Sequence, residues 1–185
     1  MPDGSSLART PWKTLSSRRV YENRWIAVRE DLAQMPDGRT TPYGVVECRP
    51  CVGVLPLLDR STVLLVGQYR YVARGFLWEM PTGAMHPGEL EEAAAQRELR
   101  EETGYEAASL VKLCHFDTSK SVVDETAHLY LGEGLRPALR EPDPTEFIEL
   151  GVFGFDEVLR MVERSEIRDA MTVIAVLHAA RRLGR

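Results

Sequence analysis

The sequence predicts an α+β fold, with mixed β-sheets flanked by a few helices. Short stretches typical of β-strands fill most of the first 70 or so residues, a helix-type segment follows in the middle, and two more helices close the chain. With 185 residues, 44% of them hydrophobic, the chain can bury a core of its own without disulfides. We find no internal repeat and no long linker, so we expect one main domain.

The N-terminal part is expected to be a short leader followed by strands. Residues 1–11 are rich in turn formers and lack an apolar period, which predicts a loose leader before a single domain over residues 12–185. Strand signals begin at Trp12, and the link at residues 35–38 (Met-Pro-Asp-Gly) has the composition of a turn. The expected N-terminal strands, within residues 12–48, cover residues 14–21, 25–34 and 43–47.

The central part is expected to hold the buried strands and the first helix. Two continuously apolar runs, 51–58 and 62–71, are typical of strands buried on both faces. A loop with two Gly and two Pro, 81–88, precedes a helix from about Glu89 to Thr103, which Gly104 would end in a left-handed cap. Further strands are expected at 108–116, 126–131 and 147–153, and further helices at 156–163 and 169–183.

The composition disfavours several classes of protein. Three cysteines and no signal-peptide pattern favour a reducing, cytoplasmic compartment over a secreted disulfide scaffold. Cys48 and Cys51 spell C-x-x-C, but no second pair completes a zinc site. No apolar run is long enough for a membrane helix. The net charge of −5 and scattered arginines make nucleic acid an unlikely partner.

The acidity is concentrated on the first expected helix. Between Glu89 and Glu102 there are six Glu and two Arg, a net charge of −4 within the chain's −5. At about 100° per residue, Glu98, Glu101 and Glu102 fall within an arc of about 100°, so three carboxylates share one helix face. Like charges at this spacing repel, and no Lys on this helix compensates them. A solvated surface is the simpler interpretation, whereas a bound cation would explain the pattern.

Carboxylates alone indicate a hard cation. Mg²⁺ or Mn²⁺ prefers oxygen ligands and completes its coordination with water and substrate phosphate. A backbone carbonyl of Thr82 or Gly83 can reach such an ion, since a glycine lets the chain pass close by. Arg97, beside Glu98 and four residues before Glu101, can hold these side chains in place.

These residues form a motif that resembles the Nudix box. The pattern is Gly83, five residues, Glu89, seven residues, then Arg97-Glu98-Leu99-x-Glu101-Glu102-x-Gly104-Tyr105. The resemblance implies the Nudix fold and cleavage of a phosphoanhydride in a nucleoside diphosphate linked to another moiety. It also implies that the three box glutamates coordinate about two or three divalent ions, with Glu89 and Arg97 in support.

The segment before the box resembles the ADP-ribose and nucleotide-sugar pyrophosphatases of this family. Its marks are Gln68-Tyr69-Arg70 and the run from Trp78-Glu79 to Pro81-x-Gly83. The resemblance implies that Arg70 contacts substrate phosphate or ribose, a role that suits its planar fork of donors. An edge-strand arginine paired with an acid is an equal alternative. Glu79 would assist the metal site or pair with a neighbour.

The segment after the box carries the expected base. The polar loop 118–125 ends in Asp124 and Glu125. By resemblance Glu125 orients or deprotonates the attacking water, with Asp124 as the alternative. Lys120 and Ser121 stand where the strict ADP-ribose group has a proline, so the sugar and base are left open.

The N-terminal strands resemble the extra antiparallel sheet that builds a homodimer and stacks the nucleobase in this branch. Trp25 is our candidate for stacking, while an aromatic that only anchors an interface is an equal alternative. The expected function is hydrolysis of ADP-ribose or another nucleotide sugar to a nucleoside monophosphate and a sugar phosphate. Alternatives are a nucleoside triphosphate or capped-RNA pyrophosphatase and, outside enzymes, a nucleotide-sugar-sensing module.

Overall fold

The computed structural model describes residues 9–140 and 147–185, which form two compact units. The first unit contains the chain up to Arg49 together with Asp117–Glu125, and the second contains Pro50–Phe116 and the chain from Thr126 onward. Residues 1–8 of the expected leader lie outside the described residues. None of the helices built from the described residues has the length and apolar character of a membrane span.

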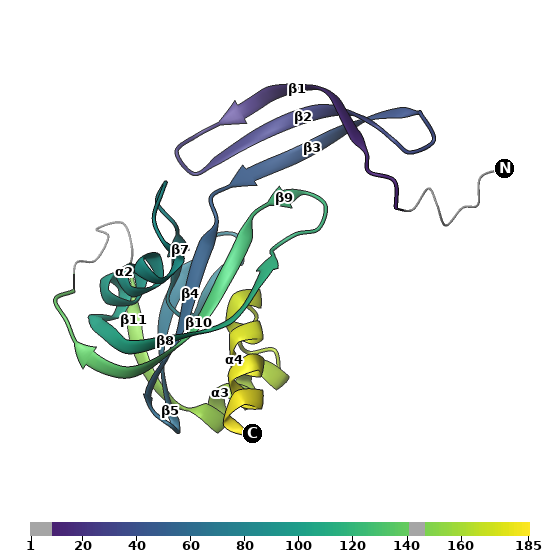
Figure 1. The fold of residues 1–185 in the computed structure, drawn as a ribbon. Coiled ribbons are helices and arrows are strands. Elements are labelled where there is room, and N and C mark those ends of the chain that lie inside the picture. The colour runs from purple at the N-terminus through teal and green to yellow at the C-terminus, as the bar shows by residue number, and fades with distance from the viewer. Residues whose placement is uncertain (1–8, 141–146) are drawn as a thin grey trace. The chain divides into compact units, whose positions relative to one another are not determined.

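The first unit is a four-stranded sheet in the order β1-β2-β3-β9 (Figure 1). Its strands are β1 (Lys13–Glu22), β2 (Ile26–Gln34), β3 (Thr40–Cys48) and β9 (Val123–Asp124). The first three are antiparallel, as the sequence predicts, and β9 joins β3 in parallel. The Val46 amide donates to the Val122 carbonyl at 2.8 Å. The polar loop that carries the expected base therefore contributes strand β9 to the N-terminal sheet, which the sequence did not indicate.

The second unit is built on a seven-stranded mixed sheet. The path runs β11-β5-β4-β10-β8, with β6 added to β5 and β7 added to β4. Strand β10 pairs with β4 in parallel while β5 pairs with β4 antiparallel, which confirms the predicted α+β class with mixed sheets. Its strands are β4 (Cys51–Asp59), β5 (Thr62–Arg70), β6 (Gly75–Glu79), β7 (Thr82–Ala84), β8 (Tyr105–Asp117), β10 (Thr126–Pro137) and β11 (Glu149–Gly154).

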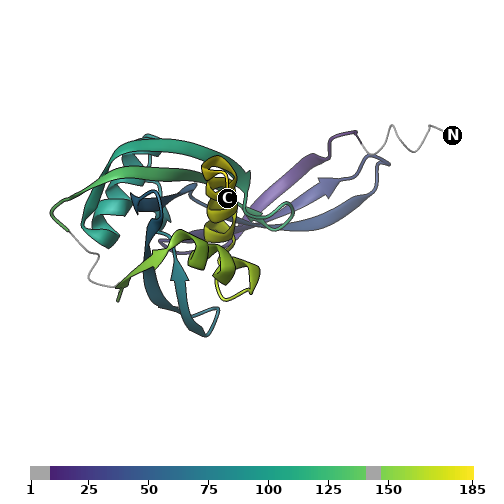
Figure 2. The same ribbon diagram turned by 90° about the horizontal axis from the view of Figure 1, so that it is seen from below.

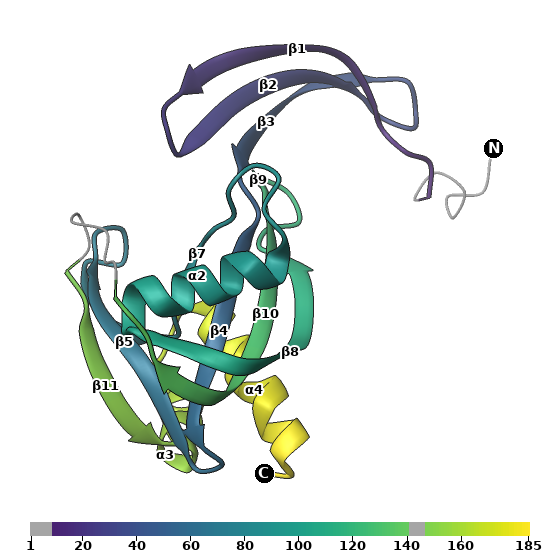
Figure 3. The ribbon, with the colours of Figure 1, turned by 60° about the vertical axis from the view of Figure 1, so that its left-hand side comes forward.

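Helices cover both faces of this sheet (Figures 2 and 3). Successive residues of a strand point to opposite faces, and β4 divides its side chains accordingly. Val52 and Val54 pack with α2 (Glu91–Thr103). Leu55 and Leu57 pack with α3 (Phe155–Glu163) and α4 (Ala170–Leu183) on the other side. The result is an α/β/α arrangement whose central strand is buried on both faces.

Several boundaries differ from those expected. Helix α2 begins at Glu91 rather than Glu89, because the Glu89 carboxylate accepts the His86 amide in the preceding turn. Gly104 ends this helix at φ 75°, the predicted left-handed cap. The expected 81–88 loop contains β7, and β6 was not anticipated, because strands of three and five residues have too few positions to show a period. β8 and β11 begin at Tyr105 and Glu149 rather than 108 and 147.

Candidate active site

The candidate site is centred on the acidic residues of α2. Glu98, Glu101 and Glu102 all lie in the second half of this helix. Glu98 and Glu102 are buried, with 8% and 4% of their surface exposed, and Glu101 is half-buried. Burying a carboxylate costs free energy unless a cation or hydrogen bonds compensate it. The burial of Glu98 and Glu102 therefore disfavours the interpretation of this helix face as a solvated surface.

Arg97 provides part of that compensation. Its Nε and Nη2 donate to the two carboxylate oxygens of Glu89, both at 2.9 Å. Its Nη1 donates to Glu98 at 2.7 Å and to Glu101 at 3.1 Å. The hydrogen bonds from Arg97, opposed by burial, lower the pKa of Glu89 to about 2. The arginine therefore joins the turn before α2 to two of the three box carboxylates, the contact that the sequence predicted.

Gly83 allows the backbone to pass directly against Glu98. It lies in β7, opposite Val52 of β4. A Cβ built on Gly83 would stand 2.2 Å from the Glu98 carboxylate, a separation that real atoms do not adopt. Any side chain at this position would displace the carboxylate. The structure thus brings the predicted Thr82–Gly83 segment to the predicted helix carboxylates.

The donors fit a hard divalent cation. They are the α2 carboxylates and the backbone at Gly83, which lies against Glu98. This set contains oxygen donors and no thiol or imidazole. Within residues 9–140 and 147–185, no three acidic, histidine or cysteine side chains already converge as a metal site. Glu98 and Glu101 bind the Arg97 guanidinium in this geometry. A cation would share these two carboxylates with Arg97 or take them from it.

Arg70 and Glu79 form an ion pair next to the box. The Arg70 Nε lies 3.1 and 3.0 Å from the two Glu79 oxygens, and its Nη2 donates to Oε2 at 2.6 Å. Glu79 is buried, whereas the Arg70 side chain is 40% exposed. Burial opposes protonation of Arg70, but Glu79, Glu102 and Asp169 together raise its pKa above the ordinary value. The structure thus shows Glu79 paired with Arg70, the arrangement given above as an alternative for each residue, and Arg70 keeps an exposed edge.

A pocket of about 480 Å³ adjoins this pair in the second unit. Sequence reasoning missed Arg168 and Asp169, which line it together with Arg70. Asp169 caps α4 by accepting the Thr172 amide at 2.8 Å, and the Thr172 hydroxyl accepts the Met80 amide at 3.0 Å. The acid three residues before Thr172 is a helix-start signal, but nothing in the sequence placed it beside Arg70. The pocket is lined by Arg70, Val72, Ala73, Leu77, Glu79, Thr82, Arg168, Asp169 and Ala170.

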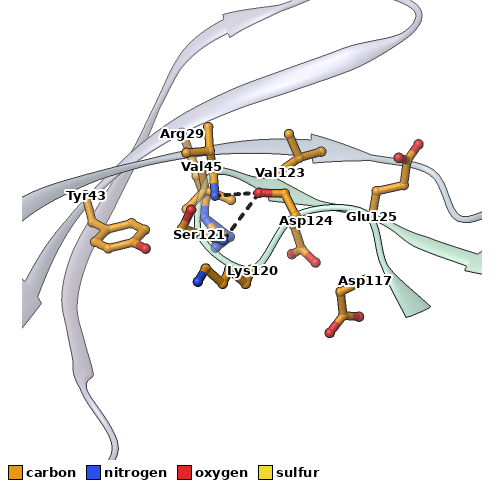
Figure 4. Close-up of a pocket in the computed structure, with 11 residues that line it drawn as sticks. Arg29, Tyr43, Val45, Asp117, Lys120, Ser121, Val123, Asp124 and Glu125 are labelled. Atoms are coloured by element: carbon orange, nitrogen blue, oxygen red, sulfur yellow. Dashed lines mark hydrogen bonds between the residues drawn. The ribbon is translucent and has the colours of Figure 1, made fainter. Parts of the chain in front are cut away.

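The two candidate bases lie in the first unit, at a second pocket of about 330 Å³ (Figure 4). Asp124 and Glu125 both line it, along with Lys120. The carboxylate of Glu125 points away from that of Asp124 in this view. The loop is held by the Ser119 hydroxyl, which accepts two backbone amides, and by the Glu125 carbonyl, which accepts the Thr118 amide at 3.1 Å. Both acids stay candidates for the base.

Trp25 lies in the first unit, just before β2, with 56% of its surface exposed. Its amide donates to the Asn23 side chain at 2.7 Å, which fixes the turn. The Arg24 guanidinium stands 4.3 Å from the centre of the indole ring and covers one of its faces. A base could stack only on the opposite face unless Arg24 moved.

The chain belongs to the Nudix family of hydrolases, which act on pyrophosphate bonds. Residues 48–172 match the NUDIX domain, and residues 12–46 match the nucleoside diphosphate sugar hydrolase N-terminal domain. The junction between these two matched segments lies close to the boundary between β3 and β4. Enzymes of this family generally use divalent metal ions, in agreement with the oxygen donors on α2.

Relatives of known name cover nearly the whole chain. The methanol dehydrogenase activator of Bacillus methanolicus and the ADP-ribose pyrophosphatase of Bacillus subtilis (strain 168) are each 32% identical over 166 residues, 89% of this chain and 90% of theirs. A crystal structure of an ADP compounds hydrolase superposes with a TM-score of 0.85, covering 95% of both chains at 22% identity. That likeness shows the shared fold.

Proposed function

We propose that the protein hydrolyses the pyrophosphate bond of ADP-ribose or a closely related nucleotide sugar, releasing a nucleoside monophosphate and a sugar phosphate. The observation that carries the proposal is the pair of buried carboxylates on α2, Glu98 and Glu102, with Gly83 held against Glu98. The name of the Bacillus subtilis relative and the N-terminal domain match favour a nucleotide sugar over other Nudix substrates.

Glu98, Glu101 and Glu102 are the residues that would hold the divalent ions, with a backbone carbonyl of Thr82 or Gly83. We propose Mg²⁺ or Mn²⁺, because the donors are all oxygen atoms. The proposed number of ions, about two or three, follows from the resemblance to the Nudix box. A bound ion would neutralise negative charge on the pyrophosphate as its bond breaks. Arg97 orients Glu98 and Glu101 through its hydrogen bonds at 2.7 and 3.1 Å.

Arg70 is proposed to bind a phosphate or ribose of the substrate. Glu79 fixes two of its nitrogens, which holds the guanidinium in one orientation and leaves its remaining edge for the substrate. Glu79 is then a positioning residue for Arg70. A preorganised cation of this kind lowers the entropy lost when the substrate binds.

Glu125 is proposed to take the proton from the attacking water, with Asp124 as the alternative. A carboxylate oxygen can accept a proton from a water molecule that lies within hydrogen-bonding distance. Trp25 is proposed to stack the nucleobase on the ring face that Arg24 leaves open. These assignments rest on the family resemblance, together with the exposure of Trp25 and Asp124 and the partial exposure of Glu125.

The N-terminal sheet is proposed to form a homodimer. Every residue of β1 is exposed, including large apolar side chains that a stable protein rarely leaves to solvent in such number. The large apolar side chains that are exposed within residues 9–49 are Trp12, Leu15, Val20, Tyr21, Trp25 and Leu32.

A reducing, cytoplasmic compartment is also proposed. Its support is the cysteine count of three, which does not suit a secreted disulfide scaffold.

A product analysis tests the proposed function. The purified protein is incubated with Mg²⁺ and, separately, ADP-ribose, other nucleotide sugars, a nucleoside triphosphate and capped RNA. We expect ADP-ribose to yield AMP and ribose 5-phosphate in equal amounts, with the highest kcat/KM of the panel. Release of inorganic pyrophosphate from the triphosphate as the dominant reaction would contradict the proposal, as would binding without turnover in both Mg²⁺ and Mn²⁺.

A further inference from the structure

We propose that Arg168 is a substrate-binding residue that takes a phosphate group in the pocket beside Arg70. This inference rests on the proposed function and adds to it a cation that the Nudix box does not contain. Arg168 lies in the connection between α3 and α4, and it lines the pocket of about 480 Å³ together with Arg70 and Thr82.

Two residues that line the pocket connect it to the α2 carboxylates within the second unit. Thr82 lines it, and the next residue, Gly83, lies against the Glu98 carboxylate. Arg70 also lines it, and the charge of Glu102 acts on this guanidinium. A molecule in the pocket therefore lies next to the residues proposed to hold the metal. The phosphates of a substrate are the groups that must come closest to those residues.

The charges of the pocket leave one cation without a partner. Glu79 is taken up by the Arg70 guanidinium, with three nitrogen–oxygen contacts of 2.6 to 3.1 Å. Asp169 accepts both the amide and the hydroxyl of Thr172 through one carboxylate oxygen. The side chain of Arg168 makes no hydrogen bond or ion pair with any of the residues 9–140 and 147–185. Arg168 is therefore available for an anion, and the acids that would oppose an anion in this pocket are Asp169 and Glu79, both already engaged by the contacts above.

Arginine suits this task chemically. Its planar fork can bind two phosphate oxygens at once, and it stays charged at any physiological pH. The phosphate could be part of the pyrophosphate that every substrate carries, or a further phosphate on the ribose of a 2′-phosphorylated substrate. Both sources present the same group to Arg168, and a matched pair of substrates separates them.

The test compares Arg168→Ala, Arg168→Lys and the wild type on ADP-ribose and on 2′-phospho-ADP-ribose. Arg164→Ala is the control, because Arg164 lies in the same connection but pairs at the surface with Glu166 at 3.7 Å. We expect Arg168→Ala to raise KM about 10- to 100-fold, the effect of losing charge-assisted hydrogen bonds, with kcat changed much less. Arg168→Lys should recover part of this loss, and Arg164→Ala should equal the wild type.

An equal rise in KM for both substrates supports contact with the pyrophosphate, and a rise confined to the 2′-phosphorylated substrate supports contact with the ribose phosphate. An unchanged KM for both in Arg168→Ala overturns the inference. Calorimetric titration with inorganic pyrophosphate separates this outcome from failure of the proposed function. A protein that does not hydrolyse ADP-ribose, but binds pyrophosphate more weakly once Arg168 is replaced, would keep the anion site and lose the proposed function.

Discussion

The carboxylate of Glu98 occupies the space that a side chain at Gly83 would need, 2.2 Å from the position of its Cβ. The position of the Glu98 carboxylate therefore depends on a glycine at position 83, because any larger residue there would have to move this carboxylate or strand β7. This relationship joins the start of the Nudix box to its helix. It predicts that the glycine matters for catalysis more than for the stability of the turn.

Gly83→Ala is expected to lower kcat/KM about 100-fold, because a shift of about 1 Å in a reacting group has this effect. Steady-state kinetics with Mg²⁺ and ADP-ribose measure it. Gly154→Ala is the matched control, since a Cβ at Gly154 would meet nothing within 4 Å. Full activity in Gly83→Ala would show that Glu98 tolerates displacement.

Arg97→Ala is expected to lower the free energy of unfolding by about 3 kcal/mol, since it leaves buried carboxylates without their cation. Added Mg²⁺ should stabilise this variant more than it stabilises the wild type, because the ion replaces the lost charge. Urea unfolding with and without Mg²⁺ measures both effects. Arg100→Ala, which breaks only an exposed pair with Glu106, should change stability by less than about 1 kcal/mol. An equal response to Mg²⁺ in Arg97→Ala and the wild type would contradict the account.

The lowered pKa of Glu89 predicts that the free energy of unfolding depends on pH. Its pKa falls from an ordinary value of 4.5 to about 2 in the folded protein, chiefly through the hydrogen bonds from Arg97. The carboxylate therefore stabilises the fold fully above about pH 4.5, and this contribution is lost as the pH falls toward about 2. Glu89→Gln removes it.

Urea unfolding between pH 7 and pH 2 tests this expectation. The difference in unfolding free energy between the wild type and Glu89→Gln should stay constant from pH 7 down to about pH 4.5. It should then decrease between about pH 4.5 and pH 2. A difference that keeps its full size at pH 2 would mean that the Glu89–Arg97 contact does not favour the ionised carboxylate.

Thr172 ties α4 to the segment before the box. Its fully buried hydroxyl accepts the Met80 amide, so Thr172→Val leaves this amide without a partner. We expect the unfolding free energy to fall by about 1–3 kcal/mol. Thr172→Ser keeps the hydroxyl and should be less destabilised than Thr172→Val. The reverse order in urea unfolding would contradict this role.

The sequence was most informative where chemistry and helical spacing coincide. The box predicted that the three glutamates share one face of α2, because Glu101 and Glu102 follow Glu98 by three and four residues, close to one turn of a helix. The short strand β9 escaped notice, because its two residues are recognised only by their partner β3. Arg168 was missed for a related reason: its pocket depends on contacts such as Met80 to Thr172, which lie 92 residues apart in the chain. Patterns of neighbouring residues in the sequence do not predict contacts between segments so far apart.

The central claim is that the buried carboxylates of α2 sustain pyrophosphate hydrolysis, and Glu102→Gln tests it most directly. Turnover of ADP-ribose with saturating Mg²⁺ is compared with that of Glu92→Gln, an exposed glutamate of the same helix. The account predicts that Glu102→Gln lowers kcat/KM about 100-fold or more, because a neutral amide binds a divalent ion poorly, while Glu92→Gln matches the wild type. Undiminished turnover in Glu102→Gln would contradict it.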